Sequence, residues 1–219
     1  IPLNVQASQI DPDQLTGFDP AELSEPWKDT DLNKVSKEIL KKIAQAKRPI
    51  VLAGGGVRLS GQHQAFIQLV EKLGVPVVTG WNAHDVIWNA HPNYVGRPGS
   101  IGDRAGNFAV QNADLLLILG SRLNIRQVSY NWKSFAREAY KIWVDIDVLE
   151  LQKPTVKAEM PVLASLTDLL PILLRTPYKG VTSEQIAWLA WCKERQRRFP
   201  TVLPEYWNNE RINTYCFIS

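Results

Sequence analysis

Two hydrophobic patterns alternate along this chain. Runs of mostly apolar residues occupy 49–53, 75–79 and 114–119, whereas apolar residues recur every three or four positions in 32–43 and 66–73. A strand of a parallel sheet is covered on both faces and reads as a continuous apolar run, while a helix that packs on one side shows the second pattern. The alternation therefore predicts βαβ units that build a parallel sheet.

The same alternation continues towards the carboxyl end. A fourth strand is predicted at 141–147 and a short fifth one near 157–162, while helices are predicted after Asp103, from about Ser165 and at 183–198. Aspartate and serine are common N-cap residues, which supports both helix starts. We expect a three-layer α/β fold with a six-stranded, mostly parallel, Rossmann-like sheet and helices on both faces.

The remaining segments lack a regular period. Residues 1–28 are rich in Pro, Asp, Gln and Ser and predict an extended linker, 29–176 predict one folded domain, and 177–219 predict a helix with an irregular tail. Residues 80–102 combine aromatic residues, prolines and glycines. They predict a long ordered loop, a type of segment that often carries a binding site.

Composition and charge narrow the class of protein. The hydrophobic fraction of 45% and the charged fraction of 21% are typical of a globular protein, and 219 residues suffice for one α/β domain with tails. No apolar run approaches the roughly 20 residues needed to cross a bilayer, so we expect no membrane partner. The net charge of +3 is spread along the chain, so we expect no nucleic-acid partner.

The positions of cysteine and histidine argue against a metal site. Cys192 and Cys216 form no metal-ligand spacing with each other or with His63, His84 and His91. We take a reducing, cytoplasmic location as the default. No arrangement of nucleophile, base and orienting group can be argued from the order of residues, so we predict no catalytic centre.

Candidate ligand contacts follow four of the predicted strands. The segments are 54–57, 79–82, 120–122 and 145–147. The carboxyl ends of parallel strands meet at one edge of the sheet, and open α/β sheets bind ligands there. We therefore expect the four segments to lie at one edge and to form one site.

Three consecutive glycines, Gly54, Gly55 and Gly56, follow the first strand, and Ser60 is expected to start the next helix. Without side chains, these residues would let backbone amides approach a phosphate. The spacing is not GxGxxG, and a tight turn between strand and helix explains the glycines equally well. Both interpretations stay open at this point.

Residues 96–104 carry a second group of glycines. Gly96, Arg97, Gly99 and further small or basic residues stand just before a predicted helix. This arrangement suits recognition of a diphosphate. A flexible surface loop is the alternative.

Charged residues follow the third and fourth strands. Arg122 and Arg126 could pair with a phosphate or stack on a ring, although a solvated position explains Arg126 equally well. Asp145 and Asp147 alternate along a strand end, so they point in opposite directions and one could accept hydrogen bonds from ribose hydroxyls. Helix capping by Asp147 is the alternative.

Several motifs occur in an order and spacing typical of one enzyme family. They are RPIVLAGGG (48–56), GVPVVT (74–79), NFAVQNADLLL (107–117), GSRL (120–123) and VDID (144–147). Over about residues 34–175 the chain resembles the central domain of thiamine-diphosphate-dependent enzymes of the acetolactate (acetohydroxyacid) synthase type.

The resemblance implies a larger parent protein. In this family a pyrimidine-binding domain precedes the central domain, and a diphosphate-binding domain with a Gly-Asp-Gly magnesium motif follows it. Residues 1–28 would then be the linker from the first domain, 29–176 the central domain, and 177–219 the helix and linker towards the third. An initial Ile1 in place of methionine fits an excised piece.

The resemblance also implies a division of labour. The parent would be a transferase or lyase that uses thiamine diphosphate and Mg²⁺ to decarboxylate a 2-oxo acid and join the product to an acceptor, as a homodimer or homotetramer. This chain would itself be non-catalytic and either structural or nucleotide-binding, with the flanking domains as its partners.

The resemblance leaves the ligand of this domain open. The matching domain holds FAD in acetohydroxyacid synthases, ADP in oxalyl-CoA decarboxylases, and nothing in several relatives. The contacts that it implies here are Gly54, Gly55, Gly56, Thr79, Gly80, Trp81, Asn82, Gly96, Arg97, Gly99, Gly120, Arg122, Asn124, Asp145 and Asp147. The synthases commonly have a histidine before the last glycine of the segment matching 96–99, where this chain has Pro98.

Two other functions fit parts of the sequence. A free-standing nucleotide-sensing or regulatory module would use the same strand ends. A sirtuin-like NAD-dependent deacylase has a related sheet and an early glycine-rich turn, but it also needs zinc-binding cysteines, which this chain lacks.

Overall fold

The computed structural model describes residues 2–23 and 25–218, and Ile1, Ser24 and Ser219 lie outside the described residues. Within those ranges six strands form one parallel sheet in the order β3-β2-β1-β4-β5-β6. The strands are β1 (Pro49–Ala53), β2 (Val77–Thr79), β3 (Tyr94–Gly96), β4 (Leu115–Leu119), β5 (Tyr140–Asp145) and β6 (Met160–Leu163). This is the strand order of a doubly wound Rossmann-like sheet, so the predicted α/β fold is confirmed.

The order of the strands reverses at the centre of the sheet. After β1 the chain adds β2 and then β3 on one side, and it returns to pair β4 with the other side of β1. The β1–β4 pairing runs from Pro49 opposite Leu115 to Ala53 opposite Leu119 without a shift. The loops after β1 and β4 therefore lie beside each other at the topological switch point, where open α/β sheets bind ligands.

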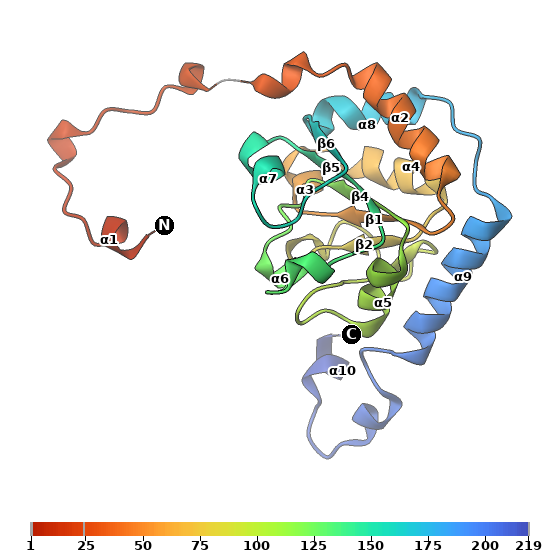
Figure 1. Cartoon of the computed structure of the whole chain (residues 1–219). Helices are drawn as coiled ribbons and strands as arrows, with labels where there is room; N and C mark the ends of the chain where they lie inside the picture. The colour runs from red at the N-terminus through yellow and green to blue at the C-terminus, as the bar shows by residue number, and fades with distance from the viewer. Residues whose placement is uncertain (1, 24, 219) are drawn as a thin grey trace.

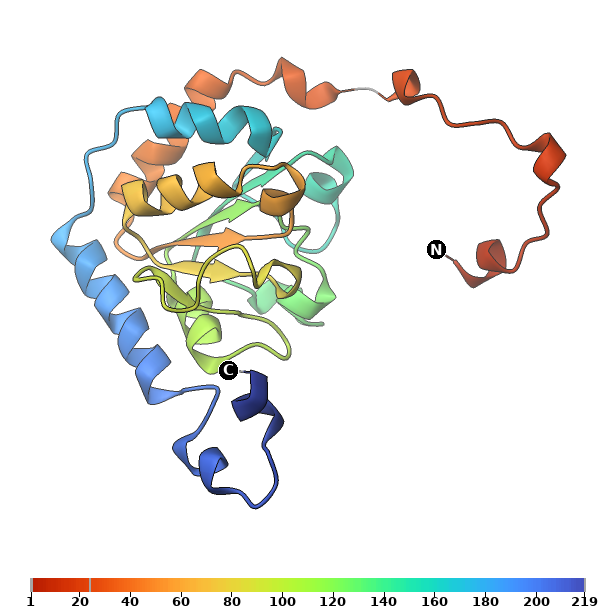
Figure 2. The same cartoon turned by 180° about the vertical axis from the view of Figure 1, so that it is seen from behind.

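Helices cover both faces of the sheet (Figure 1 and Figure 2). One core cluster packs α2 (Leu32–Gln45), α4 (His63–Leu73) and α8 (Leu166–Arg175) on one face, and a second packs α5 (Arg104–Asn112) and α9 (Ser183–Arg198) on the other. The strand residues alternate between the two clusters because successive side chains of a strand point to opposite faces. The three predicted layers are therefore present.

The predicted helix caps are largely confirmed. The side chain of Asp103 accepts from the amide of Gly106 at the start of α5, and that of Asp31 accepts from the amide of Lys34 at the start of α2. Ser165 caps α8 in the same way by accepting from the amide of Thr167. These short side chains satisfy amides that have no partner inside the helix.

Two expectations are corrected. The segment 80–102, predicted to be a loop, contains β3, which pairs in parallel with β2 and completes the six strands. The strand is only three residues long and lies between two prolines, so no period marks it in the sequence. The helix expected from Ser60 begins at His63, because residues 56–59 already form a helix of their own.

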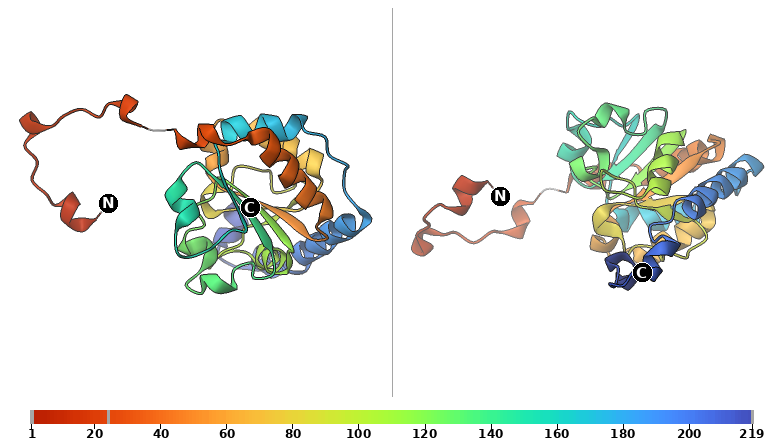
Figure 3. Two further views of the ribbon diagram at one scale, coloured as in Figure 1. Left: turned by 45° about the horizontal axis from the view of Figure 1, so that its top comes forward. Right: turned by 90° about the horizontal axis from the view of Figure 1, so that it is seen from below.

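Short helices follow three of the strands at the carboxyl edge of the sheet. They are α3 (Gly56–Leu59) after β1, α6 (Ile125–Val128) after β4 and α7 (Val148–Gln152) after β5. Single helical turns, α1 (Leu3–Gln6) and α10 (Thr214–Ile218), lie in the two tails. Residues 2–23 extend away from the domain in all views, including Figure 3, and all of them are exposed.

Candidate functional site

The loops after β1, β2, β4 and β5 meet at the carboxyl edge of the sheet, on the left of the domain in Figure 1. Backbone hydrogen bonds join each loop or strand end to the next one across the edge. From donor amide to acceptor carbonyl they are Gly80 to Ala53 (2.8 Å), Gly54 to Leu119 (2.9 Å) and Gly120 to Val144 (3.1 Å). The expectation that these strand ends lie at one edge is confirmed.

The three consecutive glycines have different surroundings. A Cβ added to Gly54 would lie 2.2 Å from the carbonyl oxygen of Gly120, and one added to Gly56 would lie 2.7 Å from the Cα of Gly120. The amide of Gly56 also donates to that carbonyl oxygen, at 2.9 Å. Packing between the two loops therefore explains Gly54 and Gly56, in line with the interpretation as a tight turn.

Gly55 has no such packing reason to be glycine. Its added Cβ would meet nothing closer than the carbonyl oxygen of Asn82, at 3.7 Å, and its amide donates to no acceptor in the described part of the chain. Gly55 is thus the one residue of the three that leaves an amide without an acceptor and room for a methyl group at the switch point.

The segment 96–104 is held in place rather than flexible. The carboxylate of Asp103 accepts from the amides of Arg97 and Gly106, both at 2.6 Å. The side chain of Asn107 accepts from the amide of Gly99 at 3.0 Å and donates to its carbonyl at 3.1 Å. Because these amides are already engaged, a phosphate would meet the guanidinium of Arg97 here rather than the backbone.

Arg122 and Asn124 follow β4 with different surroundings. The side chain of Arg122 is 78% exposed and forms an ion pair with Glu150. The side chain of Asn124 caps α6 by accepting from the amides of Arg126 (3.0 Å) and Gln127 (3.3 Å). Arg122 therefore reaches solvent at the switch point, whereas the side-chain oxygen of Asn124 is used in the fold.

Asp145, the last residue of β5, and Asp147, two positions later, differ in the same way. Asp147 caps α7 by accepting from the amide of Leu149 at 2.8 Å, as its alternative interpretation had it. Asp145 is only 7% exposed and accepts from the amide of Asp147 at 3.1 Å. Asp145 is thus the candidate whose carboxyl group could still receive hydroxyl donors at the edge.

Asp145→Asn is expected to stabilise the protein at neutral pH. Burial raises the pKa of Asp145, amide hydrogen bonds from Asp147 and Ile146 oppose this, and the carboxylates of Glu150 and Asp147 raise it further. A carboxyl group whose pKa is raised in the folded protein binds a proton more readily there than in the unfolded chain. The free energy of unfolding therefore falls as the pH rises from 3.8, the ordinary pKa, through the pKa in the folded protein. Asparagine does not ionise, so the advantage of the variant should exist at pH 7 and vanish below about pH 3. Thermal melts across this range measure it, and an advantage that does not change with pH contradicts the assignment.

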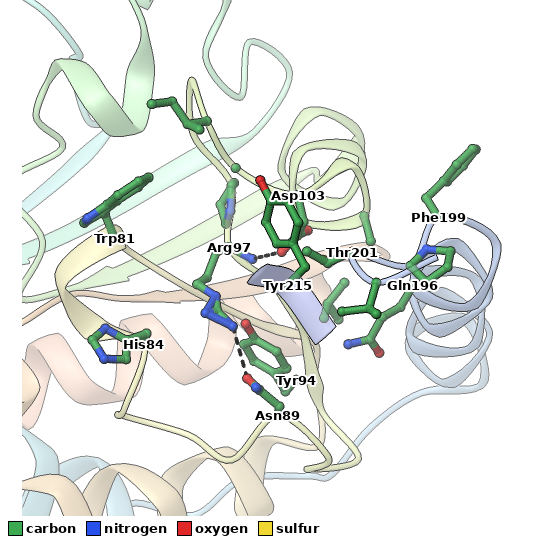
Figure 4. Close-up of a pocket in the computed structure, with 18 of the residues that line it drawn as sticks. Trp81, His84, Asn89, Tyr94, Arg97, Asp103, Gln196, Phe199, Thr201 and Tyr215 are labelled. Atoms are coloured by element: carbon green, nitrogen blue, oxygen red, sulfur yellow. Dashed lines mark hydrogen bonds between the residues drawn. The ribbon is translucent and has the colours of Figure 1, made fainter. Parts of the chain in front are cut away.

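A cavity of about 890 Å³ lies beyond β3, between the segment 81–105 and the chain after α9 (Figure 4). Trp81, Gly96 and Arg97 are the candidate residues that line it, and Arg97 donates to the side-chain oxygen of Asn89 at 3.3 Å. The candidates at the switch point, such as Gly55 and Arg122, do not line it. The structure therefore divides the predicted site into a central part and a part at the β3 side.

Several lining residues of this cavity were not predicted. They are His84, Asn89, Tyr94, Gln196, Phe199, Thr201 and Tyr215, together with neighbouring apolar residues. Burial raises the pKa of the Tyr94 hydroxyl. The only signal in the sequence was the aromatic character of 80–102, because contact with the segment after α9 depends on the tertiary fold.

Two further observations concern ligands and membranes. Among residues 2–23 and 25–218, no group of three or more His, Cys, Asp or Glu side chains is placed to hold a metal ion. Over the same residues, the helices are too short or too polar to cross a membrane.

Comparisons with known proteins agree with the motifs. A family described as the central domain of thiamine pyrophosphate enzymes matches residues 36–173. The chain is 35% identical over 170 residues to a probable acetolactate synthase large subunit of Methanococcus aeolicus. The aligned residues make up 74% of this chain and 27% of that protein. It is 32% identical over 166 residues to the acetolactate synthase large subunit of Corynebacterium glutamicum (75% and 26%). It is 36% identical over 139 residues to that of Lactococcus lactis (64% and 24%). The chain spans about a quarter of the length of these relatives.

Proposed function

This chain belongs to the central-domain family of thiamine pyrophosphate enzymes, and we propose that it is the nucleotide-binding, non-catalytic domain of an acetolactate synthase-like enzyme. The relatives named above are acetolactate synthase large subunits or probable ones. The proposed ligand is FAD or ADP, bound along the carboxyl edge of the sheet.

The proposal includes the organisation of the parent. Residues 1–28 would be the linker from a pyrimidine-binding domain, 29–176 the central domain, and 177–219 the connection to a diphosphate-binding domain. The match over 36–173 and the short coverage of the relatives support this division. The other domains would bind thiamine diphosphate and Mg²⁺, which supply the decarboxylation of a 2-oxo acid and its carboligation. A cytoplasmic homodimer or homotetramer completes the proposal.

The observation that carries the nucleotide assignment is a set of three groups at the switch point that can still form hydrogen bonds with a ligand. Gly55 leaves a free amide and room for a methyl group, Arg122 exposes a guanidinium, and Asp145 presents a carboxyl group, all at or just after the ends of three adjacent strands. An amide and a guanidinium suit phosphates, and a carboxylate suits ribose hydroxyls. These residues fit the nucleotide part that FAD and ADP share.

The length of the carboxyl edge of the sheet distinguishes binding of ADP from binding of FAD. From β3 to β5 there are four strand spacings of about 4.8 Å, or roughly 19 Å. ADP can occupy the part over β1, β4 and β5, whereas contact with Arg97 and Trp81 at the β3 side requires an extended dinucleotide. Trp81 is 58% exposed at the cavity, where a planar ring could stack on it.

Calorimetric titration of the 219-residue chain with FAD and with ADP tests the proposal. We expect both to bind, and tighter binding of FAD would extend the site to Trp81. Gly55→Ala should weaken both ligands by about tenfold or more, because the added methyl group occupies the space beside the free amide. Absence of binding by both ligands would overturn the nucleotide assignment and leave a structural domain.

A further inference from the structure

Three charged side chains form a connected group beside the switch point. The Nε of Arg122 donates to Oε1 of Glu150 at 2.5 Å, and the Nζ of Lys153 donates to Oε2 of the same carboxylate at 2.9 Å. The side chain of Glu150 is 11% exposed, compared with 78% for Arg122. A largely buried carboxylate is thus held between two cations, one of which reaches into solvent.

Lys153 also fixes the backbone of the loop after β4. Its Nζ donates to the carbonyl oxygens of Arg122 and of Leu123, the latter at 3.4 Å, and lies 5.1 Å from the centre of the Trp143 ring. Leu123 has a φ of +46°, a backbone conformation that residues other than glycine rarely adopt. Such a conformation persists only where surrounding contacts impose it, and Lys153 supplies two of them.

The ion pair leaves most of the Arg122 guanidinium unused. Only its Nε bonds to Glu150, and its two terminal amino groups donate to no acceptor in the described part of the chain. A guanidinium can bind a phosphate or carboxylate through two parallel hydrogen bonds. Arg122 therefore presents a pair of donors to solvent at the switch point.

Both partners of the pair carry their charge at neutral pH. Burial opposes the ionisation of Glu150, but hydrogen bonds from Lys153 and Arg122 prevail and lower its pKa. The hydrogen bond and the charge of Glu150 raise the pKa of Arg122.

We propose that Glu150 and Lys153 are positioning residues for a phosphate group of the bound nucleotide, which the two terminal amino groups of Arg122 receive. This inference rests on the proposed nucleotide site and adds the residues that prepare it. The alternative is that Glu150 competes with the phosphate for Arg122. A competing carboxylate would occupy the pair of terminal donors, whereas Glu150 bonds to Nε alone.

The test compares ADP with adenosine, which lacks phosphates, in calorimetric titrations of the 219-residue chain. Arg122→Gln should weaken the binding of ADP by roughly 10- to 100-fold. Glu150→Gln and Lys153→Met should each weaken the binding of ADP by about two- to tenfold. Each variant removes a contact that holds Arg122 or its loop in place, so Arg122 must then be immobilised on binding. The affinity for adenosine should stay unchanged in all three variants.

The matched control is Glu138→Gln, which removes the same charge from an exposed pair with Arg137 just before β5, at the opposite edge of the sheet. It should leave ADP binding unchanged. In the Arg122→Gln background, Glu150→Gln should have no further effect on ADP, because the positioned side chain is already absent.

Each contrary result has a distinct meaning. Tighter binding of ADP by the Glu150→Gln variant would show that Glu150 competes with the phosphate, and it would overturn the inference. Unchanged binding of ADP would also overturn it, because Glu150 would then not position Arg122. Equal weakening of ADP and adenosine would show a structural role only, and it too would overturn the inference. If the unmodified chain binds neither ADP nor FAD, the proposed function fails first and this inference falls with it.

Discussion

Gly54→Ala is expected to lower the free energy of unfolding by about 3 kcal/mol or more, which corresponds to a fall in Tm of roughly 6–12 °C for a domain of this size. The added Cβ would lie 2.2 Å from the carbonyl oxygen of Gly120 and 2.5 Å from the Cα of Ser121. Both are backbone atoms, so no side-chain rotation relieves the contact. The ends of β1 and β4, at the centre of the sheet, would have to separate. Urea or thermal unfolding followed by circular dichroism measures the loss.

The neighbouring Gly55→Ala is the control for this prediction. Gly55 has φ and ψ of −60° and −20°, which alanine adopts readily, and its nearest contact would be 3.7 Å away. We expect a change within about 1 kcal/mol, in either direction. Similar losses in the two variants would show that the close approach of the loops does not explain the glycines. A loss confined to Gly54→Ala would assign one glycine to the fold and leave its neighbour for the ligand.

Elements with a clear period were predictable because burial itself creates the period. The runs at β1 and β4 are apolar throughout since helices cover both faces of the sheet at these strands. β3 was missed because it is short and its strand character comes from pairing with β2, which is not a local property. Similarly, α3 is a single turn that begins at the last of the three glycines and has no apolar stripe.

The location of the candidate site was predictable, but the use of its groups was not. Parallel strands place their carboxyl ends together, so the edge follows from the alternation alone. Whether an amide or carboxylate is free depends on contacts from distant segments, such as Gly120 against Gly56. Glu150 and Lys153 were not singled out, because a glutamate and a lysine three positions apart are ordinary surface residues in sequence.

The point along the chain at which the folded unit ends also depends on contacts between distant segments. The helix α9 lies beyond residue 176, yet Trp188 on it is buried and donates through its indole nitrogen to the carbonyl of Pro49 at 3.1 Å. Gln185 is fully buried at the start of α9 and donates to the carbonyls of Ile43 (2.8 Å) and Ala46 (2.8 Å) at the end of α2. One side chain thus connects the last long helix to the first.

Gln185→Glu is expected to lower the free energy of unfolding by about 3 kcal/mol at pH 7. The amide nitrogen that now donates to two carbonyl oxygens would become a carboxylate oxygen that repels them, in a position without access to water. Burial would also raise the pKa of the new carboxyl group, so protonation should recover part of the loss as pH falls towards 4. Chemical unfolding at pH 7 and pH 4 measures both effects.

Gln68→Glu makes the same chemical change at an exposed position on α4 and should stay within about 0.5 kcal/mol of the unmodified chain. A loss confined to Gln185→Glu, larger at pH 7 than at pH 4, would show that α9 is docked on α2 through this side chain. Residues 183–198 would then unfold together with the sheet, and the folded unit would extend past residue 176. A small loss that is independent of pH would instead mean that α9 detaches without disturbing the sheet, as a helix that only leads to another domain would.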